Sequence, residues 1–292
     1  MKNIFKMGVI NITPNSFSDG GEFNSRDSFS KRFGELQKWA DIIDIGAEST
    51  APFNRPITEA TELERYQKIF YPFLRSHEDP EMTLSIDTYK VNTFREVALF
   101  VHRFWPRTTL IFNDISGSID EELLAFFKED RPYKFKYVFS HNLSPTRKQA
   151  LDHMDYCLDE SCASIFMDDI ERYFKTGIDK IPKGVSVLLD PCFGFSKTRE
   201  QNHFLLKHFS HLMENLPERY DWIYGISKKS FLRFPKEMEI KNEENQNVLA
   251  QIQAILFYTL LENKRTSSAL VFRVHDKSAF EAVINVKKIF AL

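Results

Sequence analysis

The sequence predicts an α/β protein that folds as one (β/α)8 (TIM) barrel, with residues 1–292 forming a single domain. Three observations predict this fold: short apolar segments recur eight times along the chain, amphipathic segments separate them, and no linker rich in Pro, Gly or Ser divides the 292 residues. Strands that are covered on both faces have such continuous apolar runs. An open, doubly wound sheet shows the same alternation of strands and helices and is the competing fold.

The eight apolar segments are rich in Ile, Val, Leu and Phe, and they are the predicted strands. They cover residues 6–14, 41–51, 83–89, 110–118, 136–142, 186–192, 222–229 and 269–277. Apolar residues at helical spacing predict helices over residues 27–41, 59–74, 247–262 and 278–290, and the pattern is weakest between residues 119 and 180. Asp27 and either Thr58 or Thr61 precede such spacing and are the predicted N-caps.

The charge and cysteine content exclude several classes of protein. The 39 Lys and Arg residues nearly balance the 41 Asp and Glu residues, so the overall charge attracts neither nucleic acid nor an anionic membrane. The cysteines at positions 157, 162 and 192 form no Cys-x-x-Cys pair and support neither a disulfide framework nor a structural zinc site. No apolar run has the length of a membrane span, and the N-terminal one is too short for a signal peptide. We therefore expect a cytoplasmic enzyme or binding protein.

Polar side chains gather at the carboxyl ends of the predicted strands. They are Asn11, Thr13, Glu48, Ser49, Thr50, Asp87, Asn113, Asp114, His141, Asp190, Ser227, Lys229, Arg273 and His275. A single polar residue at such a position is readily explained as a helix cap or turn residue. In a (β/α)8 barrel, however, all of these ends meet at one mouth, where active sites are built. The set as a whole predicts a ligand site.

The residue types indicate what such a site binds. Asp87, Asn113 and Asp190 offer hydrogen-bond acceptors and an amide, bordered by Phe193 and Phe195. A flat heterocycle with several N–H donors would satisfy buried carboxylates of this kind, because an unpaired buried charge is costly.

Cationic side chains stand at the ends of the last two predicted strands. They are Lys229, Arg273 and His275. The pair of Arg273 and His275 at the last strand suits a phosphate group. Long polar connections follow the first two strands, at residues 11–21 and 48–58, and long loops at a barrel mouth are typical of lids.

Seven segments in one order carry a resemblance to a known family. They are NITPNSFSDGG (11–21), DIGAEST (44–50), SIDT (85–88), NDISG (113–117), DPCFGF (190–195), GISKKSF (225–231) and RVHD (273–276). Together they resemble dihydropteroate synthase of folate biosynthesis. The resemblance implies a (β/α)8 transferase that condenses 6-hydroxymethyl-7,8-dihydropterin pyrophosphate with p-aminobenzoate, giving 7,8-dihydropteroate and pyrophosphate with the help of Mg2+. It also implies a homodimer and inhibition by sulfonamides.

By motif position, the resemblance assigns roles to individual residues. The implied pterin contacts are Asp87, Asn113, Asp190 and Lys229, and the implied pyrophosphate contacts are Asn11, Arg273 and His275, with Asn11 also serving Mg2+. The implied p-aminobenzoate side and loops comprise Asp19, Thr50, Phe195 and Ser230. Pyrophosphate departure would leave a pterin cation, and Asp87, Asp190, Lys229, Arg273 and His275 are the implied catalytic residues.

The chain departs from the family pattern at a few positions. Ala51 follows the EST segment where the family has Arg, and our hypothesis is that Arg55 substitutes for it. Cys192 and Ser196 stand where the family has glycines. The Cys192 thiol either narrows the pterin pocket or is a small buried filler.

Two alternative functions stay open at this point. One is a methyltetrahydrofolate-dependent methyltransferase domain on the same barrel, which has no use for pyrophosphate. The SFSDGG loop, the Lys229-Ser230 pair and the Arg273–His275 segment argue against it. The other is a paralogue that binds pterin but lacks synthase activity because of Ala51.

Overall fold

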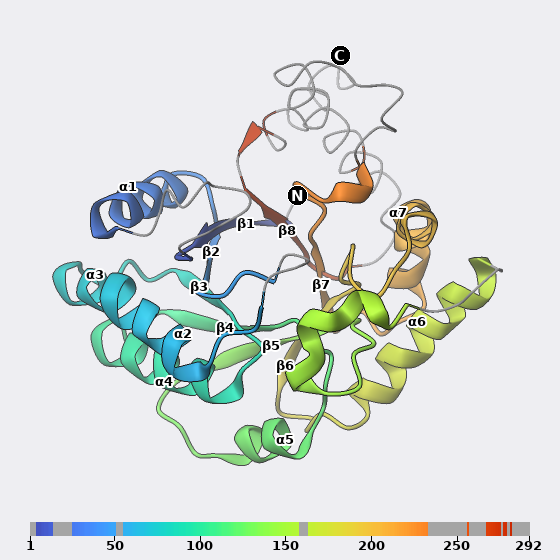
Figure 1. The fold of residues 1–292 in the computed structure, drawn as a ribbon, viewed down its shortest axis with the longest axis horizontal. Helices are drawn as coiled ribbons and strands as arrows, with labels where there is room; N and C mark the ends of the chain where they lie inside the picture. The colour runs from blue at the N-terminus through green and yellow to red at the C-terminus, as the bar shows by residue number, and fades with distance from the viewer. Residues whose placement is uncertain are drawn as a thin grey trace.

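In the computed structural model, the strands close into one parallel barrel (Figure 1). The structure describes residues 4–13, 25–50, 55–157, 163–232, 256, 267–275, 277, 278 and 281. The strands are β1 Ile4–Asn11, β2 Ile42–Gly46, β3 Thr83–Asp87, β4 Thr109–Asp114, β5 Phe135–Ser140, β6 Ser186–Asp190, β7 Asp221–Tyr224 and β8 Leu270–Val274. Each strand pairs with the next along the chain, and β8 pairs back with β1. The (β/α)8 prediction is confirmed, and an open sheet is excluded.

Helices surround the barrel, with α1 to α4 on one side in Figure 1 and α6 and α7 on the other. They are α1 Arg26–Gln37, α2 Glu59–Arg65, α3 Tyr71–Ser76, α4 Val91–Phe104, α5 Glu121–Lys128, α6 Ala163–Ile178 and α7 Arg199–Glu214. Three short elements complete the described part: a π-helical turn η1 Tyr66–Phe70 and the 3-10 segments η2 Arg147–Asp155 and η3 Ser230–Leu232. The predicted helices at 247–262 and 278–290 lie almost entirely outside the described residues.

The N-cap of the first helix lies two residues before the predicted one. Ser25 caps α1: its Oγ accepts a hydrogen bond from the Ser28 N–H at 3.2 Å, and the Ser28 side chain accepts one from the Ser25 N–H. Asp27 lies in the first turn, where a carboxylate stabilises the positive end of the helix dipole. The prediction of Asp27 as N-cap was wrong, and Thr58 is confirmed as the cap of α2 through Thr61 N–H at 3.2 Å.

The predicted helix over residues 59–74 is real but contains a π-helical turn. Pro72 lies at the start of α3 and has no N–H to donate to the carbonyl of Lys68, four residues earlier. The chain widens to η1 just before this proline, and the Lys68 carbonyl instead accepts a hydrogen bond from Arg26 Nε at 3.1 Å. The proline therefore explains why the helix is interrupted, and α1 supplies the missing donor.

The strands alternate between the barrel interior and the surrounding helices. One interior cluster consists of Met7, Ile42, Ile111, Val138, Leu188, Ile223 and Val271. Side chains of opposite parity pack outward, as when the Phe112 ring stacks on Phe94 of α4 at a centroid distance of 4.3 Å. Because side chains repeat their direction every second residue, the next interior positions toward the carboxyl ends are two residues further on, and polar residues, among them Asp44, Asn113 and Arg273, occupy most of them.

Two helical glycines provide a test of the packing between α6 and β5. A Cβ on Gly177 of α6 would overlap the buried ring of Phe139, whereas a Cβ on Gly34 of α1 would meet nothing within 4 Å. We expect Gly177→Ala to lower the free energy of unfolding by about 1–3 kcal/mol through overpacking. Gly34→Ala should raise it by up to about 1 kcal/mol, because Ala is the better helix former. Urea denaturation measures both, and two changes of the same sign would contradict this packing.

Candidate active site

Four side chains from four strands form a charged cluster inside the barrel mouth. Arg273 of β8 donates from Nε to Asp44 Oδ2 of β2 at 2.7 Å and from Nη2 to Asp87 Oδ2 of β3 at 2.7 Å. Asn113 of β4 donates from Nδ2 to both Asp44 oxygens, at 3.2 and 3.3 Å. The structure thus brings together three of the predicted site residues, far apart in the sequence, around a carboxylate that was not predicted.

Asp44 is the site residue that the sequence reasoning missed. It is fully buried, and it lies at the centre of β2, a strand in which all five residues are buried. A signal was present: an Asp inside an otherwise apolar strand needs a buried partner, because an isolated buried charge is very costly. Its place two residues before the end of β2 also puts it on the interior face.

The carboxyl of Asp87 is poised between its two protonation states. Burial raises the pKa of Asp87 from its ordinary value of 3.8 to about 7; Arg273 opposes this shift, and Asp44 adds to it. A ligand that donates N–H groups to Asp87 would favour the ionised form. The mouth therefore holds a carboxyl whose hydrogen-bonding capacity a donor-rich ring would satisfy.

Asp190 and Lys229 extend the cluster across the mouth. Burial raises the pKa of Asp190, and its Oδ1 accepts the Cys192 N–H at 2.7 Å. Burial also lowers the pKa of Lys229, whose Nζ lies 4.5 Å from the centroid of the Phe195 ring. The structure therefore places two more predicted residues, Lys229 and Phe195, in contact with each other.

His275 lies one residue beyond the end of β8. Its Nδ1 lies 3.1 Å from Ser227 Oγ, and its backbone N–H donates to the same hydroxyl at 3.3 Å. Burial and the neighbouring Arg273 hold the pKa of His275 well below its ordinary range, which favours the neutral imidazole. Ser230, also predicted at this rim, begins η3 and is exposed.

Oxygen donors face one point beside Gly46. Asn11 Oδ1 and Asp87 Oδ2 lie 3.3 and 3.5 Å from the position that a Cβ on Gly46 would take. Mg2+ prefers oxygen ligands and usually binds through one or two protein groups together with substrate phosphates and water. Within the described ranges no cluster of three or more His, Cys, Asp or Glu residues has the geometry of a metal site. The donors present fit a Mg2+ ion shared with a diphosphate, and the ion itself stays a prediction.

The second long loop is anchored at both ends through Glu48. Glu48 Oε1 accepts the Ile57 N–H at 2.8 Å, and the Lys90 ammonium forms ion pairs with Glu48 and, at 3.1 Å, with Glu62. Thr50, predicted at the p-aminobenzoate side, is half-buried just beyond Glu48. The positions of Asp19 and Ala51 lie outside the described residues, and Arg55 is exposed.

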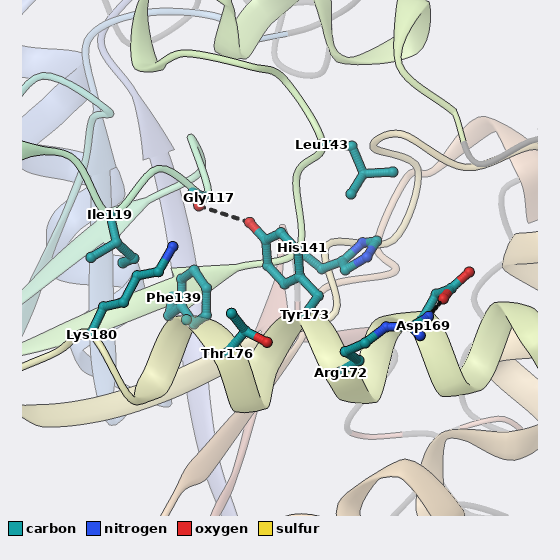
Figure 2. Close-up of a pocket in the computed structure, with 11 residues that line it drawn as sticks. Gly117, Ile119, Phe139, His141, Leu143, Asp169, Arg172, Tyr173, Thr176 and Lys180 are labelled. Atoms are coloured by element: carbon teal, nitrogen blue, oxygen red, sulfur yellow. Dashed lines mark hydrogen bonds and ion pairs between the residues drawn. The ribbon is translucent and has the colours of Figure 1, made fainter.

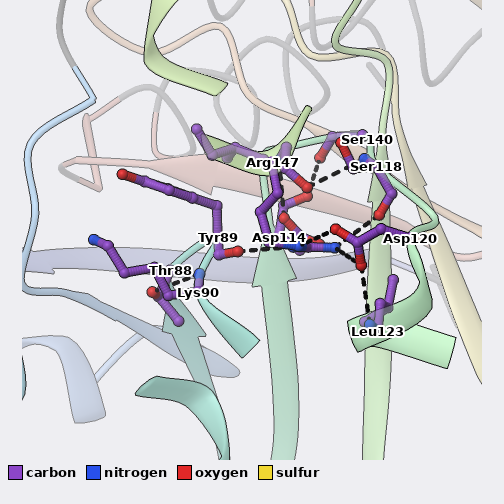
Figure 3. A network of polar contacts seen from close by, with 12 residues as sticks. Thr88, Tyr89, Lys90, Asp114, Ser118, Asp120, Leu123, Ser140 and Arg147 are labelled. Atoms are coloured by element: carbon purple, nitrogen blue, oxygen red, sulfur yellow. Dashed lines mark hydrogen bonds and ion pairs between the residues drawn. The ribbon is translucent and has the colours of Figure 1, made fainter. Parts of the chain in front are cut away.

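Asp114 belongs to a structural network and not to the mouth (Figure 3). It follows Asn113 and so points to the opposite face of β4, where its Oδ2 accepts from Arg147 Nη1 at 2.7 Å. Arg147 also donates to Asp120 at 2.9 Å and to the Tyr89 carbonyl at 2.7 Å. This buried guanidinium ties the connections after β3, β4 and β5 together.

His141 also lies on the outer side of the rim. Its ring packs against Tyr173 of α6 at a centroid distance of 4.7 Å, in a cavity of about 390 Å3 behind β5 (Figure 2). The prediction that His141 and Asp114 share the ligand site with Asn113 was therefore wrong, because their side chains point away from the mouth. Both follow an interior residue by one position, and the alternation of the strand turns them outward.

Cys192 and Ser196, which stand in place of family glycines, adopt glycine-like backbone conformations. Their φ angles are 54° and 48°, and that of Gly194 between them is 81°. The Cys192 side chain is buried in an apolar cluster with Tyr89 and Phe195. This packing is the one expected of a small apolar filler.

Known proteins resemble the chain over nearly its whole length. The sequence profile of a family described as pterin binding enzyme matches residues 7–269. A dihydropteroate synthase of Clostridium beijerinckii is 27% identical over 270 residues, 89% of this chain and 91% of that protein. A bifunctional dihydropteroate synthase/dihydropteroate reductase of Helicobacter pylori is 30% identical over 284 residues, 97% of this chain and 67% of that protein.

Solved structures agree with the fold. The crystal structure of the Yersinia pestis dihydropteroate synthase with a sulfonamide drug complex has a TM-score of 0.72 at 25% identity, covering 99% of this chain and 95% of that one. That of Anaplasma phagocytophilum dihydropteroate synthase with bound 6-hydroxymethylpterin-monophosphate has a TM-score of 0.73 at 24% identity, covering 98% of this chain and 99% of that one.

Among the described helices, none combines the length and apolar character that crossing a membrane requires.

The raised pKa of Asp87 gives a prediction about stability. A carboxyl whose pKa is higher in the folded than in the unfolded state makes the free energy of unfolding fall as pH rises, here between 3.8 and about 7. We expect Asp87→Asn to raise that free energy at pH 8 by up to about 4 kcal/mol, since the pKa rises from 3.8 to about 7 and each pKa unit is about 1.4 kcal/mol. The variant keeps the Asp44–Arg273 pair.

Urea unfolding at pH 5 and pH 8 measures this effect, with the exposed Asp179→Asn as control. The gain should be larger at pH 8 than at pH 5. A variant less stable than the wild type at pH 8 would show that the Arg273 pair outweighs the burial of Asp87.

Proposed function

This chain belongs to the pterin-binding enzyme family, and we propose that it is a transferase that makes 7,8-dihydropteroate. Its substrates would be 6-hydroxymethyl-7,8-dihydropterin pyrophosphate and p-aminobenzoate, and its second product pyrophosphate. The observation that carries the proposal is the buried Asp44–Arg273–Asp87 cluster with Asn113, a set of oriented acceptors and one cation at the barrel mouth. A donor-rich heterocycle with an anionic tail is the ligand that such a set complements.

The pterin would lie between the carboxylates of opposite strands. Asp87, Asn113 and Asp190 would take the N–H donors of the ring, and Lys229 would donate to its carbonyl. The C–O bond between the exocyclic methylene and pyrophosphate breaks, and its electron pair leaves with the pyrophosphate. Positive charge then spreads into the electron-rich ring, where Asp87 and Asp190 stabilise it.

The departing anion would be held by groups on the other side of the mouth. Arg273 and His275 would bind the pyrophosphate. The bound anion would raise the pKa of His275 and favour its protonated form. Asn11 would hold Mg2+ together with the phosphate oxygens. When bound, the ion supplies positive charge that lowers the energy of the leaving pyrophosphate.

The p-aminobenzoate would approach along Phe195, with Thr50 and Ser230 at the edge of its pocket. Its amine lone pair attacks the methylene, and the resulting arylammonium is acidic enough to lose its proton without a strong general base. The two long loops, including Asp19, would exclude water from the cation. We further propose that sulfonamides inhibit the enzyme, since the Yersinia pestis relative was solved with a sulfonamide drug complex. We also propose that the enzyme is a homodimer and lies in the cytoplasm.

A pyrophosphate-release assay tests the proposed reaction. We expect release that depends on p-aminobenzoate and is matched by formation of 7,8-dihydropteroate. Pterin binding without release would support the paralogue that lacks synthase activity. Methyl transfer from methyltetrahydrofolate, with no release, would support the methyltransferase alternative; either result would overturn the proposal.

Arg55 provides a test of the second loop. If its guanidinium replaces the arginine that the family has at the position of Ala51, then Arg55→Ala removes a charge-assisted contact to p-aminobenzoate. We expect the KM for p-aminobenzoate to rise about tenfold or more, with the KM for the pterin substrate unchanged. Arg103→Ala, an exposed arginine of α4, is the matched control. An unchanged KM for p-aminobenzoate would remove Arg55 from the site.

A further inference from the structure

The connection after β6 is wound around a buried ammonium group. Lys197 is 1% exposed, and its Nζ lies 2.9 Å from the Phe195 carbonyl, 3.3 Å from the Cys192 carbonyl and 3.2 Å from the His141 carbonyl. The positive φ angles at Cys192, Gly194 and Ser196 coil this segment tightly. Burying an ammonium is favourable only when such acceptors surround it.

An imidazole nitrogen is the fourth atom around the ammonium, whose three N–H bonds are shared among these four acceptors. His141 Nδ1 lies 2.8 Å from Lys197 Nζ, and Lys197 donates, so the neutral ring carries its hydrogen on Nε2. That Nε2 has no hydrogen-bond partner among the described residues, and the ring lies beside Tyr173 and Leu143 in the cavity of Figure 2. Burial and the charge of Lys197 keep the pKa of His141 well below its ordinary range. The imidazole is therefore a fixed acceptor for this ammonium.

These contacts join the loop after β6 to the end of β5. Phe195, whose carbonyl Lys197 holds, carries the ring that faces Lys229. Asp190 is held differently: its carbonyl accepts the His141 N–H at 2.8 Å, and it pairs with Ser140 in the β5–β6 ladder. Loss of the ammonium would therefore release the Phe195 side of the mouth and leave Asp190 in place.

We propose that Lys197 is a positioning residue: its ammonium, held by His141, fixes the loop after β6 so that Phe195 forms one wall of the p-aminobenzoate pocket. This role rests on the proposed function for its consequence in catalysis. The hydrogen bonds of the Lys197 ammonium to His141 and to the loop carbonyls, which we call the clamp, do not depend on that function. Lys197 touches no substrate in this arrangement and acts only through Phe195 and Cys192.

Steady-state kinetics of Lys197→Met tests the role. Met keeps the length of the side chain and removes the ammonium. We expect the KM for p-aminobenzoate to rise about tenfold or more, because small misplacements of binding groups cost that much, and the KM for the pterin pyrophosphate to stay within about threefold. Lys180→Met, an exposed lysine just after α6, is the matched control and should leave both values unchanged.

Two substitutions of His141 test the same clamp without altering Lys197. His141→Asn keeps an acceptor near the Nδ1 position and should resemble the wild type. His141→Leu removes the acceptor and should raise the KM for p-aminobenzoate as Lys197→Met does. Equal KM changes for both substrates, or no change in either, would overturn the proposal; if Lys197→Met does not fold, the His141 pair decides.

Amide hydrogen exchange separates this proposal from the proposed function. Exchange at residues 193–197 should be about tenfold or more faster in Lys197→Met than in Lys180→Met, because the loop loses its anchor. If the wild-type enzyme forms no dihydropteroate, the proposed function is overturned. The comparison of exchange rates in the two variants would still test the clamp, because it does not depend on activity. Equal exchange in the two variants would overturn the clamp whatever the activity.

Discussion

The ion pair between Asp44 and Arg273 is the interaction on which the mouth depends. Asp44 is fully buried, and among the described residues the guanidinium of Arg273 and the amide of Asn113 donate hydrogen bonds to its carboxylate. The same guanidinium reaches Asp87, so one cation orients two carboxylates on neighbouring strands. Removing Arg273 would leave the buried Asp44 carboxylate without a cation, which costs several kcal/mol, whereas without Asp44 the guanidinium would still be paired with Asp87.

The mouth holds more carboxyl groups than Arg273 can pair, and a ligand with hydrogen-bond donors would supply the missing partners. Arg273 neutralises one carboxylate and shares itself with a second, while Asp87 and Asp190 both have pKa values raised by burial. Burial disfavours the ionised form of both carboxyls, and hydrogen-bond donors from a bound ring would favour it. The buried carboxyls of the mouth are in this way suited to a ring that carries several N–H donors.

A second set of buried cations holds the loops from outside the mouth. Lys90 pairs with Glu48, Arg147 joins three connections, and Lys197 gathers the carbonyls of the loop after β6. Each cation has a fixed set of acceptors, and none of the three touches the Asp44–Arg273 pair. Inner charges thus face the ligand, and outer charges set the loops that border it.

The sequence alone determined the barrel, its eight strands and most of the mouth, because both depend on local alternation. A buried strand needs a continuous apolar run, and parallel strands of a barrel bring their carboxyl ends together, so Asp87, Asn113 and Arg273 were predictable as neighbours. The cap at Ser25 and the π turn before Pro72 were not, since each depends on a competing local donor or a contact with another helix.

Only the tertiary structure decided which polar residues face the ligand. Asp44 was missed because its partner lies 229 residues away in the chain. His141 and Asp114 were misplaced because a shift of one residue along a strand reverses the direction of a side chain. Lys197 became significant only when the loop folded, since its acceptors come from three separate backbone positions and one ring that no local pattern brings together.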